Sequence, residues 1–182
     1  TFSENYNQKK RRINFTFLKY YASGLSIRRC ALLLNVNPKT VDRRVAFLGK
    51  KCARLNEKFR QKKRNVHNMV MDDLITKENS KLKPLSISIA VDEDTRHILG
   101  VEVSRIPAFG HLAKIALKKY GHRPNEHPEA LERLFKSITP SLSSEVLIKT
   151  DEHQSYPYVI KKYLPRSKHE TYKSERAHVA GQ

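Results

Sequence analysis

The chain has 182 residues and a formal net charge of +18, with 36 Lys and Arg against 18 Asp and Glu. This length allows one ordinary domain, or a small domain joined to a medium one. No segment approaches the roughly 18 apolar residues of a transmembrane helix, and no signal peptide is visible. Two cysteines, Cys30 and Cys52, are too few for a disulfide framework or a zinc site, and we expect Cys30 to be a small buried residue.

The positive charge is concentrated in the first third of the sequence. Residues 1–64 hold 18 Lys and Arg and 3 acidic residues, a net charge of +15. Residues 65–182 hold the other 18 basic residues and 15 acidic ones, a net charge of +3. Such asymmetry indicates a segment that binds a polyanion, joined to a second segment with a different task. We therefore predict two domains, 1–64 and 65–182.

Three helices are predicted in the basic segment. The first covers residues 14–22 and ends at Ser23-Gly24. Ser26 is expected to cap a second helix over residues 27–34, and Asn37 a third helix that has Pro38 in its first turn and extends towards Phe59. Two short helices joined by a three-residue turn are typical of a helix-turn-helix. An ordinary three-helix bundle with a solvated basic face is the alternative.

A helix-turn-helix at this position would bind DNA through the start of its last helix. Backbone N–H groups there can contact a phosphate, and basic or hydroxyl side chains can contact phosphates or base edges. Basic runs at 9–12 and 62–64 would add affinity that does not depend on DNA sequence. The candidate DNA-binding residues are Arg28, Arg29, Lys39, Thr40, Arg43 and Arg44.

The second segment predicts a mixed α+β or α/β fold. Strands are expected at residues 66–75, 85–91 and 97–103, with a tight polar connection at 92–96 and an antiparallel pairing of the last two. Helices at 110–120 and 128–138, a strand at 145–149, a helix at 155–163 and a strand at 168–172 follow. Three strands with short links, followed by strands reached through helices, indicate the RNase H-like layout, in which the first strand lies beside the fourth.

Two aspartates of this segment are candidate catalytic residues and metal ligands. Asp72 lies within an apolar strand, where a charge needs a partner or a metal, and Asp151 follows the fourth strand directly. If the two strands are neighbours, both carboxylates can hold Mg²⁺ or Mn²⁺ in a two-ion site. Because Asp73 is adjacent to Asp72, alternation alone does not decide which of them points inward. Asp151 alone would also suit a turn or a helix cap.

The chain resembles the transposases of bacterial insertion sequences, in particular the group typified by insertion sequence one. The matching segments span most of the chain, in the order SGLSIRR (23–29), NPKTVDRR (37–44), LG (48–49), MDD (71–73), KPLS (83–86), TRHILG (95–100) and TDEHQSY (150–156). It implies a cytoplasmic, nucleoid-associated bacterial or archaeal protein. Such a protein binds the double-stranded DNA of its element's ends and of the target, in some cases as a homo-oligomer.

The resemblance also implies an acidic triad, whose first two members match Asp72 and Asp151. The third, a glutamate on a helix after the last strand, has no match, since Glu170 and Glu175 are the only late acids. The four-cysteine zinc ribbon of many members is missing as well. We therefore expect a C-terminally incomplete catalytic domain in a fragment or a decayed copy.

The leading hypothesis is a transposase that cleaves and transfers DNA strands. A non-catalytic DNA-binding protein or regulator derived from a transposase is the second. A nuclease acting on RNA or on hybrids is the third, and it is disfavoured because the deep groove of RNA accommodates a recognition helix poorly.

Overall fold

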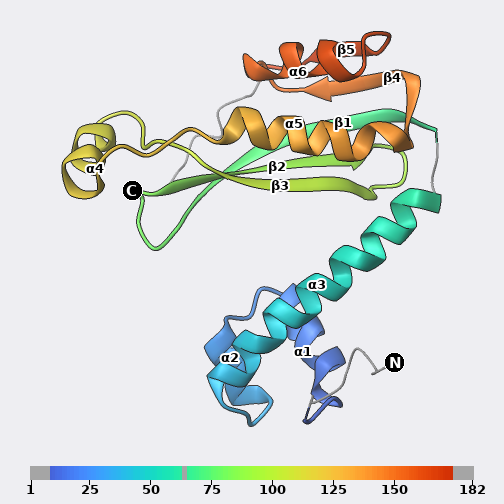
Figure 1. The fold of residues 1–182 in the computed structure, drawn as a ribbon. Helices are drawn as coiled ribbons and strands as arrows, with labels where there is room; N and C mark the ends of the chain where they lie inside the picture. The colour runs from blue at the N-terminus through green and yellow to red at the C-terminus, as the bar shows by residue number, and fades with distance from the viewer. Residues whose placement is uncertain (1–8, 63–64, 174–182) are drawn as a thin grey trace. The chain divides into compact units, whose positions relative to one another are not determined.

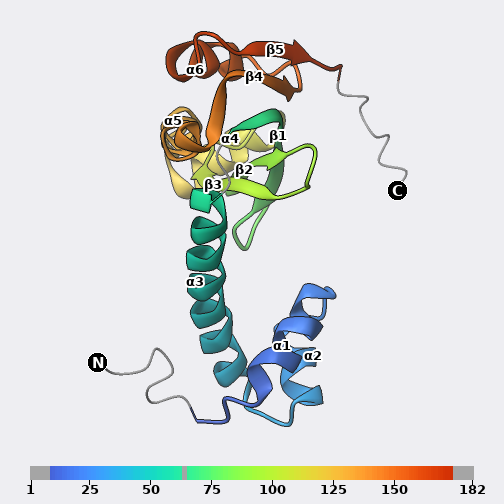
Figure 2. The ribbon, with the colours of Figure 1, turned by 90° about the vertical axis from the view of Figure 1, so that its right-hand side faces the viewer.

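The computed structural model describes residues 9–62 and 65–173. The chain divides into two compact units, Thr1–Lys58 and Phe59–Gln182. Figures 1 and 2 show the helical first unit and the sheet of the second. Within the described ranges, no helix is both long and apolar enough to cross a membrane.

The first unit is built from helices α1 (Ile13–Ala22), α2 (Ile27–Leu33) and α3 (Pro38–Lys62), the last turn of α3 belonging to the second unit. Its small core consists of Phe17, Cys30, Ala31 and Val41, all buried. The predicted burial of Cys30 is therefore confirmed. The predicted helices agree with the observed ones to within a residue or two, except that α3 extends past Phe59 to Lys62.

Capping explains why α2 and α3 start where they do. The Ser26 hydroxyl accepts a hydrogen bond from the Arg29 N–H at 3.3 Å, and the Asn37 side-chain oxygen accepts one from the Lys39 N–H at 2.9 Å. Pro38 is the first residue of α3, where its missing N–H is not needed. In the turn between the two helices Asn35 adopts a φ of +50°, a left-handed conformation that Asn tolerates better than most residues.

The second unit contains one five-stranded mixed sheet. Its strands are β1 (Val66–Lys77), β2 (Pro84–Asp92), β3 (Ile98–Arg105), β4 (Leu142–Thr150) and β5 (Lys168–Thr171). The spatial order is β3-β2-β1-β4-β5; β1, β2 and β3 are antiparallel, whereas β4 is parallel to β1 and to β5. The prediction that the first strand lies in the middle of the sheet beside the fourth is confirmed.

Helices α5 (His127–Ile138) and α6 (Ser155–Tyr163) pack on one face of this sheet, while α4 (Leu112–Tyr120) precedes them in the chain. The side of α5 predicted to be apolar is fully buried at Leu131, Leu134 and Phe135. A short 3₁₀ turn (Thr139–Ser141) leads from α5 into β4. The core between helices and sheet therefore joins β1, β4, α5 and α6, the elements that carry the candidate site.

Gly100 on β3 is required by the packing of α5. A Cβ atom at this position would lie 2.5 Å from Leu134 Cδ1 and 2.8 Å from Ile138 Cγ2, and both of these side chains are fully buried. We expect Gly100→Ala to destabilise the second unit by about 1–3 kcal/mol, the usual cost of overpacking a core. Urea unfolding measures the change. Gly49→Ala, on a helix with open space around the glycine, is the control and should not be destabilised.

Candidate functional site

An open cavity of about 550 Å³ lies where the C-terminal end of β4 meets the middle of β1. Its lining carries three carboxylates and two lysines; the residues are Val70, Met71, Asp72, Glu93, Lys149, Thr150, Asp151, Tyr172 and Lys173. Both aspartates predicted to act as catalytic residues thus share one cavity.

Strand pairing explains this meeting of residues distant in sequence. Val70 pairs with Lys149 at the end of the parallel β1–β4 ladder, and Asp72 and Asp151 each lie two residues further along their segments, where both line the cavity. An oxygen of Asp72 accepts a hydrogen bond from the Asp73 N–H at 2.8 Å. An oxygen of Asp151 likewise accepts one from the His153 N–H at 3.2 Å. These backbone bonds orient both carboxylates.

The cavity lining also contains two basic side chains, Lys149 and Lys173, against its three acids. Lys149 donates a hydrogen bond of 2.7 Å to Glu93, and this bond raises the pKa of the Lys149 ammonium. Lys173 lines the cavity as well. The cavity therefore combines oxygen ligands suited to a cation with ammonium groups suited to a phosphate.

The alternation of β1 corrects one expectation drawn from the sequence. Asp72 was expected to be the charge enclosed within an apolar strand, but its side chain is exposed on the face that α5 and α6 do not cover. Asp73 points to the helix-covered face, like Met69 and Met71, and it supplies the half-buried charge. The two neighbours differ because successive strand residues point to opposite faces.

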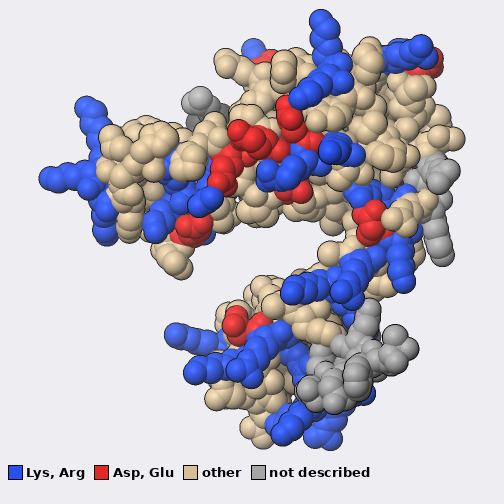
Figure 3. Space-filling model, in the orientation of Figure 1, with Lys and Arg blue, Asp and Glu red and all other residues tan. Residues whose placement is uncertain are grey.

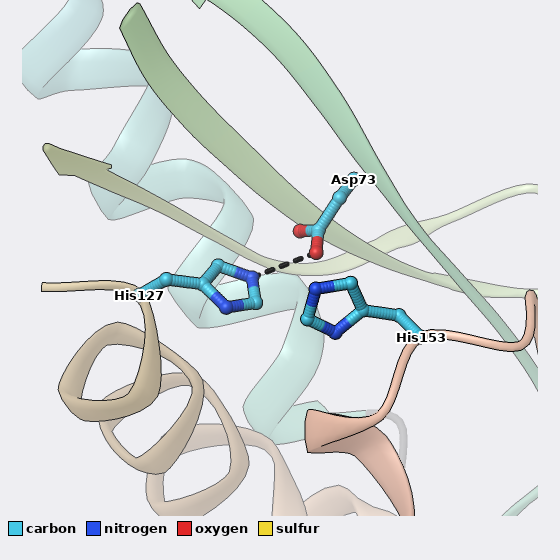
Figure 4. A group of neighbouring side chains, drawn as sticks. All are labelled: Asp73, His127 and His153. Atoms are coloured by element: carbon cyan, nitrogen blue, oxygen red, sulfur yellow. Dashed lines mark hydrogen bonds and ion pairs between the residues drawn. The ribbon is translucent and has the colours of Figure 1, made fainter. Parts of the chain in front are cut away.

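Asp73 belongs to a second group of side chains, together with His127 and His153 (Figure 4). Asp73 Oδ2 lies 2.7 Å from His127 Nε2, and the Ser88 hydroxyl donates a hydrogen bond to Asp73 Oδ1. The His127 and His153 rings meet edge to face, with centroids 5.1 Å apart. Burial favours the neutral carboxyl, but the hydrogen bonds from His127 and Ser88 outweigh it and lower the pKa of Asp73 below its ordinary value of 3.8.

Tyr156 is a buried side chain close to the aspartates of both groups. Its side chain is fully buried, and its hydroxyl lies next to Asp73 with no well-formed hydrogen bond to any described residue. Burial and then the negative charge of Asp73 raise the pKa of Tyr156 far above its ordinary value of 10.0, with smaller contributions from Asp151 and Asp72. All three aspartates are therefore near this hydroxyl, which keeps its proton at neutral pH.

The candidate DNA-binding residues all lie in the first unit, but they differ in their exposure to solvent. Arg28, Arg29, Lys39 and Arg43 are exposed, and Thr40 is half-buried. Arg44 is only 7% exposed, and its guanidinium donates a hydrogen bond to the Lys9 carbonyl. Its place in the interior gives Arg44 a packing role, and it is removed from the set of expected DNA contacts.

Basic side chains cover much of the face of the first unit shown in Figure 3. Between residues 9 and 58 the only acids are Asp42 and Glu57. On the second unit, acidic and basic side chains are intermixed over the same view. The distribution agrees with the charge asymmetry of the sequence.

Sequence reasoning missed the roles of His127, Ser88 and Tyr156. His153 and Tyr156 belong to the TDEHQSY segment, so their proximity to Asp151 was visible without their partners being known. Nothing in the sequence marked His127, which lies 54 residues from Asp73 and meets it only because α5 packs on the sheet.

No known protein family model matches the chain, and no curated protein is significantly similar to it.

Proposed function

We propose that this protein is a DNA-processing protein of the transposase type. Its first unit binds duplex DNA, and its second unit is an RNase H-like domain that cleaves and transfers DNA strands. The observation that carries this proposal is the placement of Asp72 and Asp151 in one cavity by the pairing of β1 with β4.

The sheet order supports the RNase H-like assignment. Three antiparallel strands are followed by two parallel strands reached through helices, and β1 occupies the centre. In this arrangement a carboxylate in the middle of β1 and another after β4 are neighbours although 79 positions separate Asp72 from Asp151.

The donor set of the cavity fits a hard cation, because oxygen ligands suit Mg²⁺ and Mn²⁺. Asp72 and Asp151 would hold the metal. When bound, a pair of such ions activates a water or a 3′-hydroxyl and stabilises the leaving oxygen of a phosphodiester. Lys149 and Lys173 would attract the phosphate backbone to the same cavity.

The first unit supports the DNA-binding part of the proposal. Helices α2 and α3 are joined by a short turn, as in a helix-turn-helix, and exposed Lys39 and Arg43 lie in the first two turns of α3. Arg28 and Arg29 on α2 are exposed as well. We assign these four side chains, with Thr40, to contacts with phosphates or base edges.

Removal of one of these charges should change the salt dependence of DNA binding. We expect Arg43→Ala to weaken binding to a random-sequence duplex, and to reduce the slope of log K against log salt by about 1, because one phosphate contact is lost. Fluorescence anisotropy at several salt concentrations measures both quantities. Lys118→Ala removes an equal charge from the exposed end of α4 and should change the slope little. Equal slopes for Arg43→Ala and the unmodified chain would contradict the assignment.

A second candidate function is DNA binding without cleavage. The pairing of Glu93 with Lys149 favours this function. Glu93 is the third acid of the cavity, and because it is paired with Lys149 it is not presented as a third metal ligand. Its signature is salt-dependent DNA binding with no strand cleavage in either Mg²⁺ or Mn²⁺.

A further inference from the structure

Asp73, His127 and His153 come from three separate segments and meet at one point. Asp73 lies on β1, His127 is the first residue of α5, and His153 lies between β4 and α6. Each can offer one ligand atom, and these atoms all lie within 4.8 Å of one another. Figure 4 shows the two imidazole rings and the carboxylate converging on a common space.

We propose that these three side chains bind a single divalent transition-metal ion of the zinc type. Two imidazole nitrogens and one carboxylate oxygen are a common ligand set for such an ion, whereas Mg²⁺ prefers oxygen ligands alone. The proposed site includes two nitrogen ligands and binds a zinc-type ion. It therefore differs from the cavity that contains Asp72 and Asp151, whose oxygen ligands suit Mg²⁺.

The carboxylate of this site is already held in place. Ser88, which is fully buried, donates a hydrogen bond to Asp73 Oδ1, and this bond fixes the orientation of the other oxygen towards His127 Nε2. Hydrogen bonds of this kind orient the ligands of metal sites in proteins. The ion would replace the proton that His127 Nε2 and Asp73 Oδ2 share across 2.7 Å.

The exposed side chain of His153 gives a metal ion access to the site from solvent. Asp73 and His127 are largely enclosed, with 11% and 7% of their side chains exposed, but His153 is exposed to solvent. Its Nδ1 accepts a hydrogen bond from the Ser155 N–H at 3.3 Å, and its other ring nitrogen faces Asp73. Coordination through that nitrogen requires the ring proton to move to Nδ1, so the long Ser155 contact is lost on binding.

The ion would fix the two backbone segments that carry the cavity carboxylates. Asp73 follows Asp72 directly, and His153 lies two residues after Asp151. This consequence rests on the proposed function, whereas binding of the ion does not. Loss of the ion should therefore loosen both segments.

Calorimetric titration of the metal-stripped full chain with Zn²⁺, in a large excess of Mg²⁺ to occupy oxygen-only sites, tests the proposal. We expect one Zn²⁺ to bind per chain, and His153→Ala to weaken this binding by at least about a hundredfold, since a direct ligand is worth no less than its hydrogen-bonded supports. Because His153 is exposed, its removal should leave the fold intact, which circular dichroism verifies. His122→Ala removes another exposed histidine and is the matched control.

Co²⁺ gives an independent readout, because its visible absorption reports imidazole coordination and should disappear in His127→Ala and His153→Ala. Unchanged Zn²⁺ affinity in His153→Ala, or no binding at one equivalent, would overturn the proposal.

Asp72→Asn separates the zinc-type site from the proposed function: it should retain Zn²⁺ binding while losing any Mg²⁺-dependent DNA cleavage. If Zn²⁺ does not bind but Mg²⁺-dependent cleavage is intact, the zinc-type site is rejected and the proposed function is not.

Discussion

Asp151→Asn is expected to reduce Mg²⁺-dependent DNA cleavage by about two to three orders of magnitude while DNA binding by the first unit persists. The change removes one negative charge from the cavity shared with Asp72 but preserves the shape of the side chain and its acceptor for the His153 N–H. A metal ion contributes several kcal/mol of charge stabilisation in the transition state, and each 1.36 kcal/mol corresponds to about a tenfold change in rate. Asp72→Asn should have an effect of similar size. Cleavage of a labelled supercoiled plasmid in Mg²⁺ and in Mn²⁺ provides the measurement.

Asp94→Asn is the matched control, because Asp94 is an exposed turn carboxylate outside the cavity. It should retain the cleavage rate of the unmodified chain. If the unmodified chain binds DNA but does not cleave it with either metal, the non-catalytic DNA-binding function is the correct one. Cleavage that survives both Asp72→Asn and Asp151→Asn would show that the active centre lies elsewhere.

Phe135→Ala is expected to destabilise the second unit by about 3–5 kcal/mol, the usual cost of removing a buried aromatic ring from a core. Phe135 is fully buried on α5, within the same core as Tyr156 and the buried methionines of β1. For a unit of this size the loss corresponds to a fall in Tm of about 10–20 °C. Differential scanning calorimetry measures it.

The control for this prediction is Phe109→Ala in the same unit. Phe109 is 64% exposed in the connection between β3 and α4, so its removal should change stability by no more than about 0.5 kcal/mol. Similar losses for the two variants would mean that α5 is not packed on the sheet as described. Because α5 also positions His127, Phe135→Ala should weaken Zn²⁺ binding near the unfolding transition.

Local chemistry is sufficient to predict most helix and strand positions of this protein. Ser26 and Asn37 act as caps through bonds to residues two or three positions away, so their effect is encoded within a few letters of sequence. The alternation of β2 and the apolar side of α5 at Leu131, Leu134 and Phe135 are likewise local periodic patterns. Adjacency of β1 and β4, and with it the meeting of Asp72 and Asp151, was predictable only through the expected topology.

Local patterns in the sequence are thus enough to predict the basic helical segment, the strands and helices of the second unit, and two candidate carboxylates. Packing of α5 and α6 on the sheet determines which of Asp72 and Asp73 faces the helices, since a period of two distinguishes the two faces of a strand but does not indicate which face is covered. The tertiary structure also places Arg44 in the interior and brings His127 to Asp73. The physical reason is the same in each case: burial and side-chain contact between distant segments depend on how whole elements pack, and no local pattern records that packing.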